Sequence, residues 1–541
     1  MKRPFFWRGV PVLVWSLVVS SVCFSHPNTG VFDPYTFGAK GDGHTNDTKA
    51  IQAAIDNCHR AGGGKVILHS GCFVSGTLYL KSRVALMVEA GAVLRASDNL
   101  DDFPITPSKY PSYRGTLETN KMLIYAEDAN DISIGGRGTI DGNGDYWVKG
   151  PYGSPSFSKR PRIIHFRGCQ NVRVSDVTLY NSASWVQSYQ LCRNVVIDGI
   201  TVDSRENKDI EKERYADVPG RNTDGLDLVD CQGVRISNCY INCGDDAICL
   251  KSLSPDAACR DIAITNCVIS SNSSGVKIGT ETSGRVEDIT VQNCVIYDTR
   301  GDAISIISVD GARVERINIS NITARNIKGC AIFVRLGGRN RTYRENARIN
   351  TPHLKDVLIE NFQGTRIAGA IIAGLANSPV ENVVLRNINV AFEGGEKAEL
   401  SWRDIPEHVQ RYPNGKIFGT LPAYGFYIRH ARHVTLDNVH FRFINDDERP
   451  AVLCDDVAYL DIRSLKAGAT LQTAELIRLV NTRDALIAEC RPTAPVAAFL
   501  SVYGEQSADI VLLNNLLRQA RRSVIFEKPS MQSILTEVAF K

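Results

Sequence analysis

Two short acidic motifs contain the residues of this chain whose types and spacing could do chemistry. The first runs from Asn222 to Asp227 as Asn-Thr-Asp-Gly-Leu-Asp, and the second is a Gly-Asp-Asp run that ends at Asp246. Asp224 and Asp246 are 22 residues apart. If that interval is one turn of a coiled chain, the two carboxylates project from adjacent parallel strands, roughly 5 Å apart at the backbone. Asp245 then adds a third acid beside them.

Three carboxyl groups held this close together favour one type of reaction. Because like charges repel, at least one of the three should have a raised pKa and keep its proton near neutral pH. Hydrolysis of a glycosidic bond needs that division: a protonated carboxyl for the leaving oxygen and a carboxylate that activates water or attacks the sugar. The motifs therefore predict Asp224, Asp245 and Asp246 as the catalytic residues of a glycoside hydrolase.

Two structural interpretations of the acidic motifs stay open from the residues alone. Asp and Asn side chains often bond the backbone of a tight turn, and we expect that role for Asp227 and for most other single acids of the chain. Clustered carboxylates also bind hard cations such as Ca²⁺. Our prediction is the catalytic interpretation, with no metal and no cofactor.

A repeat of 27 or 28 residues organises the middle of the chain and must position these acids. Three segments share an Asn-Cys pair between apolar residues, at 236–241, 264–269 and 291–296. Fixed self-similarity of this kind is typical of a solenoid, in which each repeat packs only on its neighbours. With a fourth copy, the repeated asparagines are spaced by 28, 27 and 28 residues, at Asn238, Asn266, Asn293 and Asn321.

Each repeat consists of short alternating runs separated by Asn, Gly, Asp and Ser, which is the pattern of strands joined by tight turns. No helical pattern lies between the copies, so each repeat is expected to be a coil of strands. Stacked asparagines suit the bends, because their side chains bond turn backbone and tolerate left-handed conformations. Weaker copies extend the pattern from Val172 to Val439. The prediction is an all-β chain folded as a right-handed, single-stranded parallel β-helix.

The ends of the chain suggest how the solenoid is divided. Residues 1–25 combine a basic start, an apolar run and small residues, which is the pattern of a secretory signal peptide. We expect an N-terminal cap and the first coils over 26–110. A catalytic β-helical core is predicted over 111–450, and C-terminal coils with a cap over 451–541.

Several segments depart from the strand pattern. An apolar stripe predicts an N-terminal capping helix from Asp47 to Cys58, and a second helix is predicted from Leu512 to Val524. Long excursions near 205–220 and 390–425 interrupt the repeat. Excursions of that length usually carry function. Here we expect them to close one end of a groove and to favour exo-action.

Composition limits the partners and the location of the protein. Apolar residues make up 43% of the chain, and the formal charge is only +3, which does not indicate a nucleic-acid partner. No segment is apolar and long enough to span a membrane. We therefore expect a monomer that is secreted or periplasmic after removal of the signal peptide. Lipidation of Cys23 is the less favoured alternative, because Val22 is bulkier than such sites usually tolerate.

Fourteen cysteines follow residue 25. Several of them occupy repeated positions inside apolar runs, where buried thiols are common. We predict that most of them are free and buried.

At the acidic motifs the sequence resembles the polygalacturonase-like glycoside hydrolases of family 28. The resemblance also includes Phe37–Gly43 (Phe-Gly-Ala-Lys-Gly-Asp-Gly), Ile140–Gly144 with Trp147, and Trp185–Cys192. It implies a secreted enzyme that acts on pectic poly- or oligosaccharide by an inverting mechanism. It further implies that Asp245 is the general acid and that Asp224 and Asp246 activate the water.

The sequence departs from the family pattern on the next two coils, and the departures bear on substrate. The Gly-His-Gly of the family becomes Ser274-Gly275 without a histidine, and its Arg-Ile-Lys aligns with Ala303-Ile304-Ser305. Both cations that would contact a galacturonate carboxylate are therefore missing. The departures weaken the case for homogalacturonan as the substrate, and a related pectic linkage such as that of rhamnogalacturonan is the alternative.

Other side chains could supply the lost contacts. Because Val276 and Ile278 alternate as inward-facing residues, Lys277 should point outward onto the floor of a groove. Steps of 28 residues from Asp246 reach Ser274 and then Asp302. A cluster at Arg335, Arg339 and Arg341 could also bind an acidic sugar. The predicted substrate-binding residues are Asn222, Ser274, Lys277, Asp302 and Arg335.

Two further functions compete with hydrolysis. A β-helical polysaccharide lyase would use a base to abstract a proton beside a uronate carboxylate, and its unsaturated product would absorb ultraviolet light. A non-catalytic glycan-binding solenoid would use the aspartates for turns or for hydrogen bonds to sugar hydroxyls, and it would bind without turnover.

Overall fold

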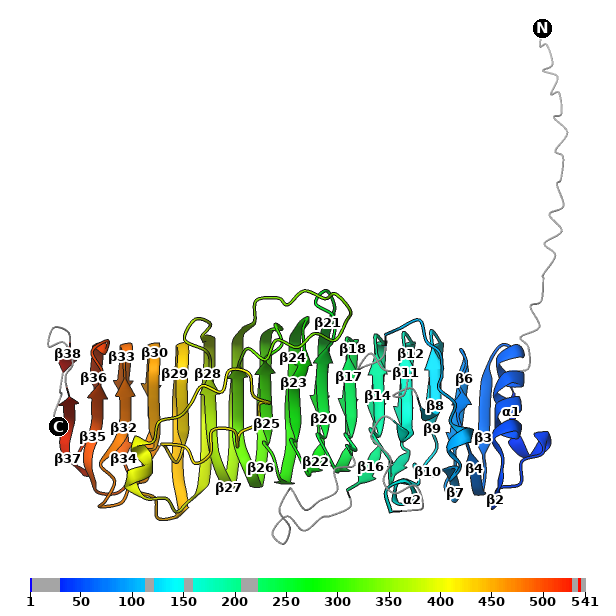
Figure 1. Ribbon diagram of the computed structural model, residues 1–541, viewed down its shortest axis with the longest axis horizontal. Helices are drawn as coiled ribbons and strands as arrows, with labels where there is room; N and C mark the ends of the chain where they lie inside the picture. The colour runs from blue at the N-terminus through cyan, green and yellow to red at the C-terminus, as the bar shows by residue number, and fades with distance from the viewer. Residues whose placement is uncertain (2–29, 112–120, 150–158, 206–221, 528–533, 537–541) are drawn as a thin grey trace.

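The computed structural model describes residues 1, 30–111, 121–149, 159–205, 222–527 and 534–536. Within these residues the chain winds as an elongated stack of coils, with the first coils at one end and the last coils at the other (Figure 1). Each coil contributes strands to three parallel ladders, named sheets A, B and C below. The predicted fold, an all-β parallel β-helix, is confirmed.

Sheet A carries the acidic motifs. Its register is parallel and unbroken across them: Ser188 pairs with Asp227, Asp227 with Cys249, and Cys249 with Lys277. The separate strands of sheet A are β5 (Leu78–Tyr79), β8 (Met122–Glu127), β11 (Arg162–Arg167), β14 (Gln187–Gln190), β17 (Leu226–Val229), β20 (Ile248–Ser252), β23 (Val276–Thr282), β25 (Ile304–Ser308), β32 (Glu475–Val480), β35 (Val496–Tyr503) and β37 (Ala520–Glu527).

Sheets B and C complete the coils. Sheet B contains β1 (Val31–Phe32), β3 (Gly64–Leu68), β6 (Val84–Val88), β9 (Asn130–Gly135), β12 (Gln170–Ser175), β15 (Arg193–Asp198), β18 (Gln232–Ser237), β21 (Ala258–Thr265), β33 (Arg483–Ala488), β36 (Ala508–Leu513) and β38 (Ile534–Thr536). Sheet C contains β2 (Asp42–Asn46), β4 (Gly71–Ser75), β7 (Ala92–Ala96), β10 (Thr139–Asp141), β13 (Thr178–Tyr180), β16 (Thr201–Ser204), β19 (Tyr240–Cys243), β22 (Val268–Ser271), β31 (Lys466–Ala467) and β34 (Arg491–Pro492). Six long strands bend through more than one sheet: β24 (Arg285–Thr299), β26 (Arg313–Leu336), β27 (His353–Ala373), β28 (Val380–Gly394), β29 (Phe426–Asn445) and β30 (Val452–Arg463).

Stacked apolar side chains fill the interior of the coils. In one row of sheet B, residues at the same coil position pair from strand to strand, and none is more than 1% exposed: Val174, Ile197, Ile236, Ile264 and Val291. Full burial of such a side chain contributes roughly 1.5–3 kcal/mol. The repeat of the sequence is therefore a repeat of core positions.

The asparagine ladder predicted at the bends is present. Asn238, Asn266, Asn293 and Asn321 all have left-handed backbone, with φ between 55° and 58°. Their side chains bond one another between coils, as in Asn321 Nδ2 to Asn293 Oδ1 at 3.0 Å and Asn361 Nδ2 to Asn321 Oδ1 at 3.0 Å. Asparagine satisfies both demands of the bend, because it tolerates this conformation and supplies a donor and an acceptor.

The cysteine prediction is confirmed for the described residues. All fourteen cysteines from Cys58 to Cys490 are free, and all but Cys72 are buried. Eleven of them belong to the main hydrophobic core, where they act as small apolar side chains.

Two helices lie near the N-terminal part of the stack, α1 (Thr48–Arg60) and α2 (Gly144–Lys149). The expected helix near Asp47 is α1, which lies at the N-terminal end of the stack (Figure 1) and packs on β1 and β3. It buries the predicted apolar stripe of Ile51, Ala54, Ile55 and Cys58. Short 3₁₀ turns occur as η1 (Pro34–Phe37), η2 (Leu100–Asp102) and η6 (Ala398–Trp402).

The helix predicted from Leu512 to Val524 is wrong. That stretch contains the end of β36, a turn and most of β37. In β36, Ile510 and Leu512 are buried while Val511 and Leu513 are partly exposed, which is the two-residue period of a strand. The coils therefore continue further toward the C-terminus than the sequence pattern indicated.

A segment called the crossing loop below, residues 395–425, connects β28 to β29. In Figure 1 it runs in yellow across the front of sheet A toward β25. Its apolar side chains Ile405, Phe418 and Leu421 pack on Phe333 and Ile371 of the sheet. The predicted excursion near 390–425 thus begins after β28 and covers part of sheet A.

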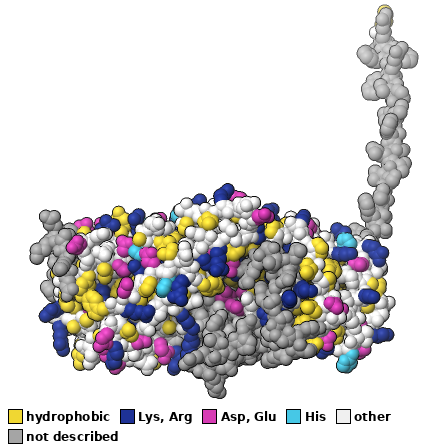
Figure 2. Space-filling model, in the orientation of Figure 1, with side chains coloured by type: hydrophobic (Ala, Val, Ile, Leu, Met, Phe, Trp, Pro, Cys, Tyr) yellow, Lys and Arg dark blue, Asp and Glu magenta, His cyan; other side chains and the backbone are white. Residues whose placement is uncertain are grey.

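Some predictions concern residues outside the described part of the chain. The signal peptide predicted over 1–25 falls there except for Met1, and the excursion predicted near 205–220 falls there except for Arg205. Among the described residues, no helix is both long and apolar enough to cross a membrane. Acidic and basic side chains are interspersed on the face shown in Figure 2, in keeping with the small formal charge of +3.

The asparagine ladder gives a test of the fold. Replacing Asn321 by Ala removes two ladder bonds and leaves a Cβ residue in left-handed backbone, which should lower local stability by about 1–2 kcal/mol. Replacing Asn321 by Gly removes the same bonds without the backbone penalty and should cost less. Hydrogen exchange of the amides around Asn321 measures both. Equal losses for the two variants would show that the left-handed conformation does not determine the residue type.

Candidate active site

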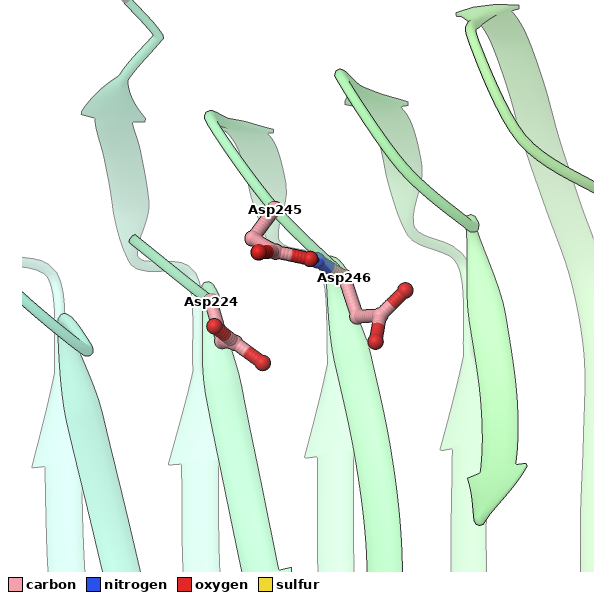
Figure 3. Close-up of side chains that lie close together, drawn as sticks. All are labelled: Asp224, Asp245 and Asp246. Atoms are coloured by element: carbon pink, nitrogen blue, oxygen red, sulfur yellow. The ribbon is translucent and has the colours of Figure 1, made fainter. Parts of the chain in front are cut away.

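The three aspartates of the motifs lie at the beginning of two neighbouring strands of sheet A. Asp224 precedes β17, and Asp245 and Asp246 precede β20. The amide of Gly225 donates to the carbonyl of Asp246 at 2.9 Å, so the two coils are hydrogen-bonded at this level. Figure 3 shows the three carboxyl groups together, and one oxygen of each lies within 4.8 Å of the others. The predicted one-coil separation is therefore correct.

Asp246 is the most strongly bonded of the three. Its Oδ2 accepts from Lys277 Nζ at 2.6 Å, and its Oδ1 accepts from Ser273 Oγ at 2.7 Å and from the amide of Ser274 at 3.1 Å. Both Asp246 and Lys277 are buried. A buried carboxylate with a lysine and two further donors is held in its charged form.

The electrostatic environment separates the three carboxyl groups. Burial opposes ionisation of Asp246, but Lys277 and Lys251 outweigh it and lower the pKa of this carboxyl. Burial and the charge of Asp246 raise the pKa of Asp245 to about 6. Burial and the neighbouring carboxylates raise the pKa of Asp224 well above its ordinary value. The site thus contains one carboxylate and two carboxyl groups that tend to hold protons.

Asn222 and Thr223 position Asp224. Asn222 Nδ2 donates to Asp224 Oδ1 at 2.8 Å, and Asn222 itself has left-handed backbone with φ of 55°. Thr223 Oγ1 donates to the carbonyl of Ser204 and accepts from the amide of Gly244 at 3.0 Å, which joins three coils. Asn222, predicted to bind substrate, is bonded to Asp224.

Asp227 does not have the turn-bonding role expected from the sequence. It lies within β17 and is fully buried, and its carboxyl oxygens accept no hydrogen bond from any described residue. Its Oδ1 is 3.6 Å from Lys251 Nζ, and burial raises its pKa to about 7. The strand register places Asp227 on the outer face of sheet A between Ser188 and Cys249, so it belongs to the site rather than to a bend.

A group of basic and aromatic residues beside Asp227 was missed by the sequence analysis. Lys251 Nζ lies 2.8 Å from Glu281 and 5.6 Å from the ring of Trp185. The guanidinium of Arg162 lies 4.4 Å from the same ring. The alternation of β20, with Cys249 and Lys251 on the outer face, could have revealed Lys251. Arg162 is too far along the chain from the motifs for any spacing to indicate it.

A cavity of about 280 Å³ lies beside Asp245, between sheet A and the crossing loop. The predicted residues Ser274, Lys277 and Asp302 line it together with Tyr412 and Lys416 of the loop. Tyr412 OH accepts from Lys277 Nζ at 3.0 Å. The sequence analysis expected the excursion near 390–425 to close one end of a groove, and the structure shows that part of it forms one wall of this cavity.

Asp302 holds this wall in place. Its Oδ1 accepts from the amide of Cys330 at 2.8 Å, and its Oδ2 accepts from Ser305 Oγ at 3.0 Å and from the amide of Gly415 at 3.2 Å. Gly415 belongs to the crossing loop. Asp302 therefore connects the loop to sheet A and also lines the cavity.

Arg335 lies elsewhere. It does not line the cavity beside Asp245, and its guanidinium donates to the carbonyls of Gly374 at 3.0 Å and of Glu407 at 2.6 Å. Burial lowers the pKa of Arg335 to about 10. Arg339, from the same predicted cluster, bonds the buried Asp310. These two cations fix loops, which argues against the predicted contact of Arg335 with substrate.

The carboxyl cluster has the ligand types of a cation site, but a lysine already pairs with one of its three members. Lys277 Nζ is already 2.6 Å from Asp246 and supplies the compensating charge. A hard cation such as Ca²⁺ needs six to eight oxygen ligands, whereas the cluster offers three carboxyl groups beside an ammonium group. The arrangement fits proton transfer better than metal binding.

Comparisons with known proteins agree with this chemistry. The sequence signature of glycosyl hydrolases family 28 matches residues 103–408. The endo-polygalacturonase of Pectobacterium carotovorum subsp. carotovorum is 26% identical over 370 residues, which cover 64% of this chain and 84% of that enzyme. Polygalacturonase-2 of Solanum lycopersicum is 24% identical over 403 residues, which cover 70% and 80% of the two chains.

A solved structure is similar in fold. The exopolygalacturonase of Thermotoga maritima superposes with a TM-score of 0.57 at 21% identity and covers 76% of this chain and 92% of its own. The family signature covers more than half of the chain, and it includes both acidic motifs and the coils between them. The chain belongs to glycosyl hydrolases family 28 and is a polygalacturonase-like glycoside hydrolase.

Proposed function

We propose that this hydrolase cleaves galacturonic acid-containing pectic poly- or oligosaccharide, with Asp245 as the general acid and with Asp224 and Asp246 activating the water. The observation that carries the proposal is the unequal charge of adjacent carboxyl groups. Lys277 lowers the pKa of Asp246 against the effect of burial, while burial and Asp246 raise the pKa of Asp245 to about 6. An acid and a base side by side are what glycosidic hydrolysis requires.

The proposed reaction needs two proton transfers. Asp245 gives its proton to the glycosidic oxygen as the bond to the anomeric carbon breaks. A water attacks that carbon and gives its proton to Asp246. Asp224 has a raised pKa as well, so it must lose its proton before it can act as a base toward the same water, although its second oxygen can accept a hydrogen bond in either state. The products are a new reducing end and a free hydroxyl.

Inversion of the anomeric centre is part of the proposal, and it rests on the family resemblance alone. The nearest oxygens of the three carboxyl groups lie within 4.8 Å, which is less than the roughly 6.5–9.5 Å that separates the carboxyl groups of most inverting glycosidases. The spacing gives inversion no support of its own. Proton NMR of the first product formed distinguishes inversion from retention directly.

We propose Lys416 as the cation that meets an acidic sugar. Lys277, the sequence-based candidate, already pairs with Asp246. Lys416 lines the cavity beside Asp245, forms no salt bridge with any described residue, and has a pKa lowered chiefly by burial. A substrate carboxylate bound beside Lys416 would offset the free-energy cost of burying its positive charge, because the carboxylate would supply a counter-charge.

We further propose exo-action. The crossing loop packs Ile405, Phe418 and Leu421 onto the floor of sheet A beyond the cavity, which argues for a groove that ends there. A polysaccharide chain could then enter only from the side of the earlier coils. An exo-enzyme would release short sugars with little loss of polymer viscosity.

Export and a monomeric state complete the proposal. Export is supported by the basic and apolar pattern of residues 1–25. Detection of the protein in the culture medium or the periplasm tests export, and light scattering tests the monomer.

A substrate panel tests the activity itself. The protein is incubated with polygalacturonate, rhamnogalacturonan and short pectic oligosaccharides, and reducing ends and ultraviolet absorbance are read together. We expect new reducing ends without absorbance. Absorbance would establish a lyase, and no product from any of the three would contradict the pectic assignment.

Removal of the proposed acid should abolish turnover. Asp245→Asn keeps the shape of the side chain but lacks the proton, so kcat should fall by roughly 10²–10⁴ with an unchanged melting temperature. Asp256→Asn, at an exposed acid on a turn that pairs with Arg348, serves as the matched control and should be fully active. Retained turnover in Asp245→Asn would refute the assignment of the acid.

The role of Lys277 predicts a change in pH dependence. Lys277 lowers the pKa of Asp246, so Lys277→Gln should raise that pKa and move the acidic limb of the kcat/KM profile to higher pH, by about 1 to 3 units. Tyr412→Phe removes the other contact of Lys277 but keeps the ion pair, and it should leave the limb in place. A limb that does not move in Lys277→Gln would show that Asp246 is not the group that must be ionised.

A further inference from the structure

A second cleft lies on sheet A, on the other side of the crossing loop from Asp245. It has a volume of about 240 Å³ and is formed by η6, the crossing loop and the later strands of sheet A. In Figure 1 the yellow helical turn η6 lies in front of the strands around β32. The residues used below, Trp402, Arg403, Asp404, Asp455, Arg478 and Tyr503, line this cleft.

We propose that this cleft binds a sugar residue of a pectic polysaccharide, as a site separate from the active site. The proposal takes its ligand class from the proposed function, because it assumes the same pectic polymer. It assigns Trp402 as the stacking platform and Asp404 and Arg403 as the polar groups at its edge.

Trp402 is exposed and yet firmly supported. The residue is 58% exposed, although its ring is one of the largest apolar groups of the chain. The guanidinium of Arg478 lies 3.7 Å from the centre of the ring on one side, and Tyr503 meets it edge-on at 5.1 Å. A large flat ring that is fixed in one orientation suits a sugar, which presents a face of C–H groups.

A buried ion pair builds this support. Arg478 and Glu475 are each 2% exposed, and Arg478 Nε donates to Glu475 Oε1 at 2.6 Å. Arg478 also donates to the hydroxyl and the carbonyl of Ser401, the residue before Trp402. Burying two charges is costly, and here their hydrogen bonds fix the short η6 turn that carries Trp402. The platform is therefore preorganised rather than a loose surface side chain.

Polar groups surround the platform. Asp404 and Arg403 are exposed at the edge of the cleft, and Arg429 pairs with Asp455 at 3.3 Å at its base. Arg429 also donates to the carbonyl of Ile405, which holds the neighbouring part of the crossing loop. An aromatic platform with a few fixed donors and acceptors is the composition of a small polar ligand site.

The position of the cleft indicates a role for the second site. Both sites lie on sheet A, and the crossing loop fills the floor between them with Ile405 and Phe418 on Phe333 and Ile371. A chain end in the active site cannot continue along the floor into the cleft. The cleft would instead hold another part of the polymer near the enzyme while ends are cleaved.

Affinity electrophoresis in gels with and without polygalacturonate tests this inference. All proteins are full-length and carry Asp245→Asn to stop turnover. Trp402→Ala should weaken binding to the gel at least about fivefold, since truncation of a central aromatic commonly has effects of this size. Trp402→Phe should keep most of the binding. Tyr459→Ala is the matched control, because Tyr459 is 51% exposed and does not line the cleft. Its ring stacks on that of His433, with the two ring centres 4.5 Å apart.

A second measurement separates the two sites. With Asp245 intact, Trp402→Ala should hydrolyse trigalacturonate with the kcat/KM of the wild type. The inference is overturned if Trp402→Ala binds the gel as well as Tyr459→Ala does, or if it loses trigalacturonate turnover in proportion to binding. Failure of the proposed function looks different, since the wild type would then hydrolyse no pectic substrate at all.

Discussion

Neighbouring strands of a parallel sheet lie about 4.8 Å apart, and this spacing brings every side chain of one coil next to its counterpart in the following coil. Inside the coils the consequence is favourable, because apolar residues such as Ile236 and Ile264 stack on one another. At the start of β17 and β20 the same spacing brings Asp224 next to the consecutive pair Asp245 and Asp246, and one oxygen of each carboxyl group lies within 4.8 Å of the others. One geometric constraint thus stabilises the fold and creates the electrostatic problem from which the chemistry follows.

The protein offsets part of this repulsion with two lysines, Lys277 and Lys251, rather than with one counter-charge for each carboxyl group. Lys277 neutralises Asp246, whereas Asp224 and Asp245 have raised pKa values because burial and neighbouring charge oppose their ionisation. An equal number of cations would have left three carboxylates and no proton to donate. The shortage of positive charge is therefore what gives the cluster both an acid and a base. The crossing loop also contributes, since it encloses one side of the site and its Tyr412 accepts a hydrogen bond from Lys277.

Much of the fold and the centre of the site could be predicted because they follow from local repetition. The spacing of asparagines defined the coil, and the alternation around Lys277 correctly placed Val276 and Ile278 in the core. Predictions failed where contacts depend on distant segments. Three contacts depend on which coil or loop lies opposite: those of Asp227 with Lys251, of Lys277 with Asp246, and of Arg335 with loop carbonyls. Short motifs do not contain that information. The C-terminal helix was wrong because the predicted stretch joins the end of β36 to most of β37 across a turn, and its apolar residues did not reveal that division.

Infrared difference spectroscopy tests the central claim, that protons reside on Asp224 and Asp245 while Asp246 is ionised. Spectra of the wild type and of Asp224→Asn, Asp245→Asn and Asp246→Asn are compared at about pH 6, where exposed carboxyl groups are ionised. If Asp224 and Asp245 hold the protons, the band of protonated carboxyl groups weakens in Asp224→Asn and in Asp245→Asn. Loss of that band only in Asp246→Asn would place the proton on Asp246 and would contradict this assignment of protons.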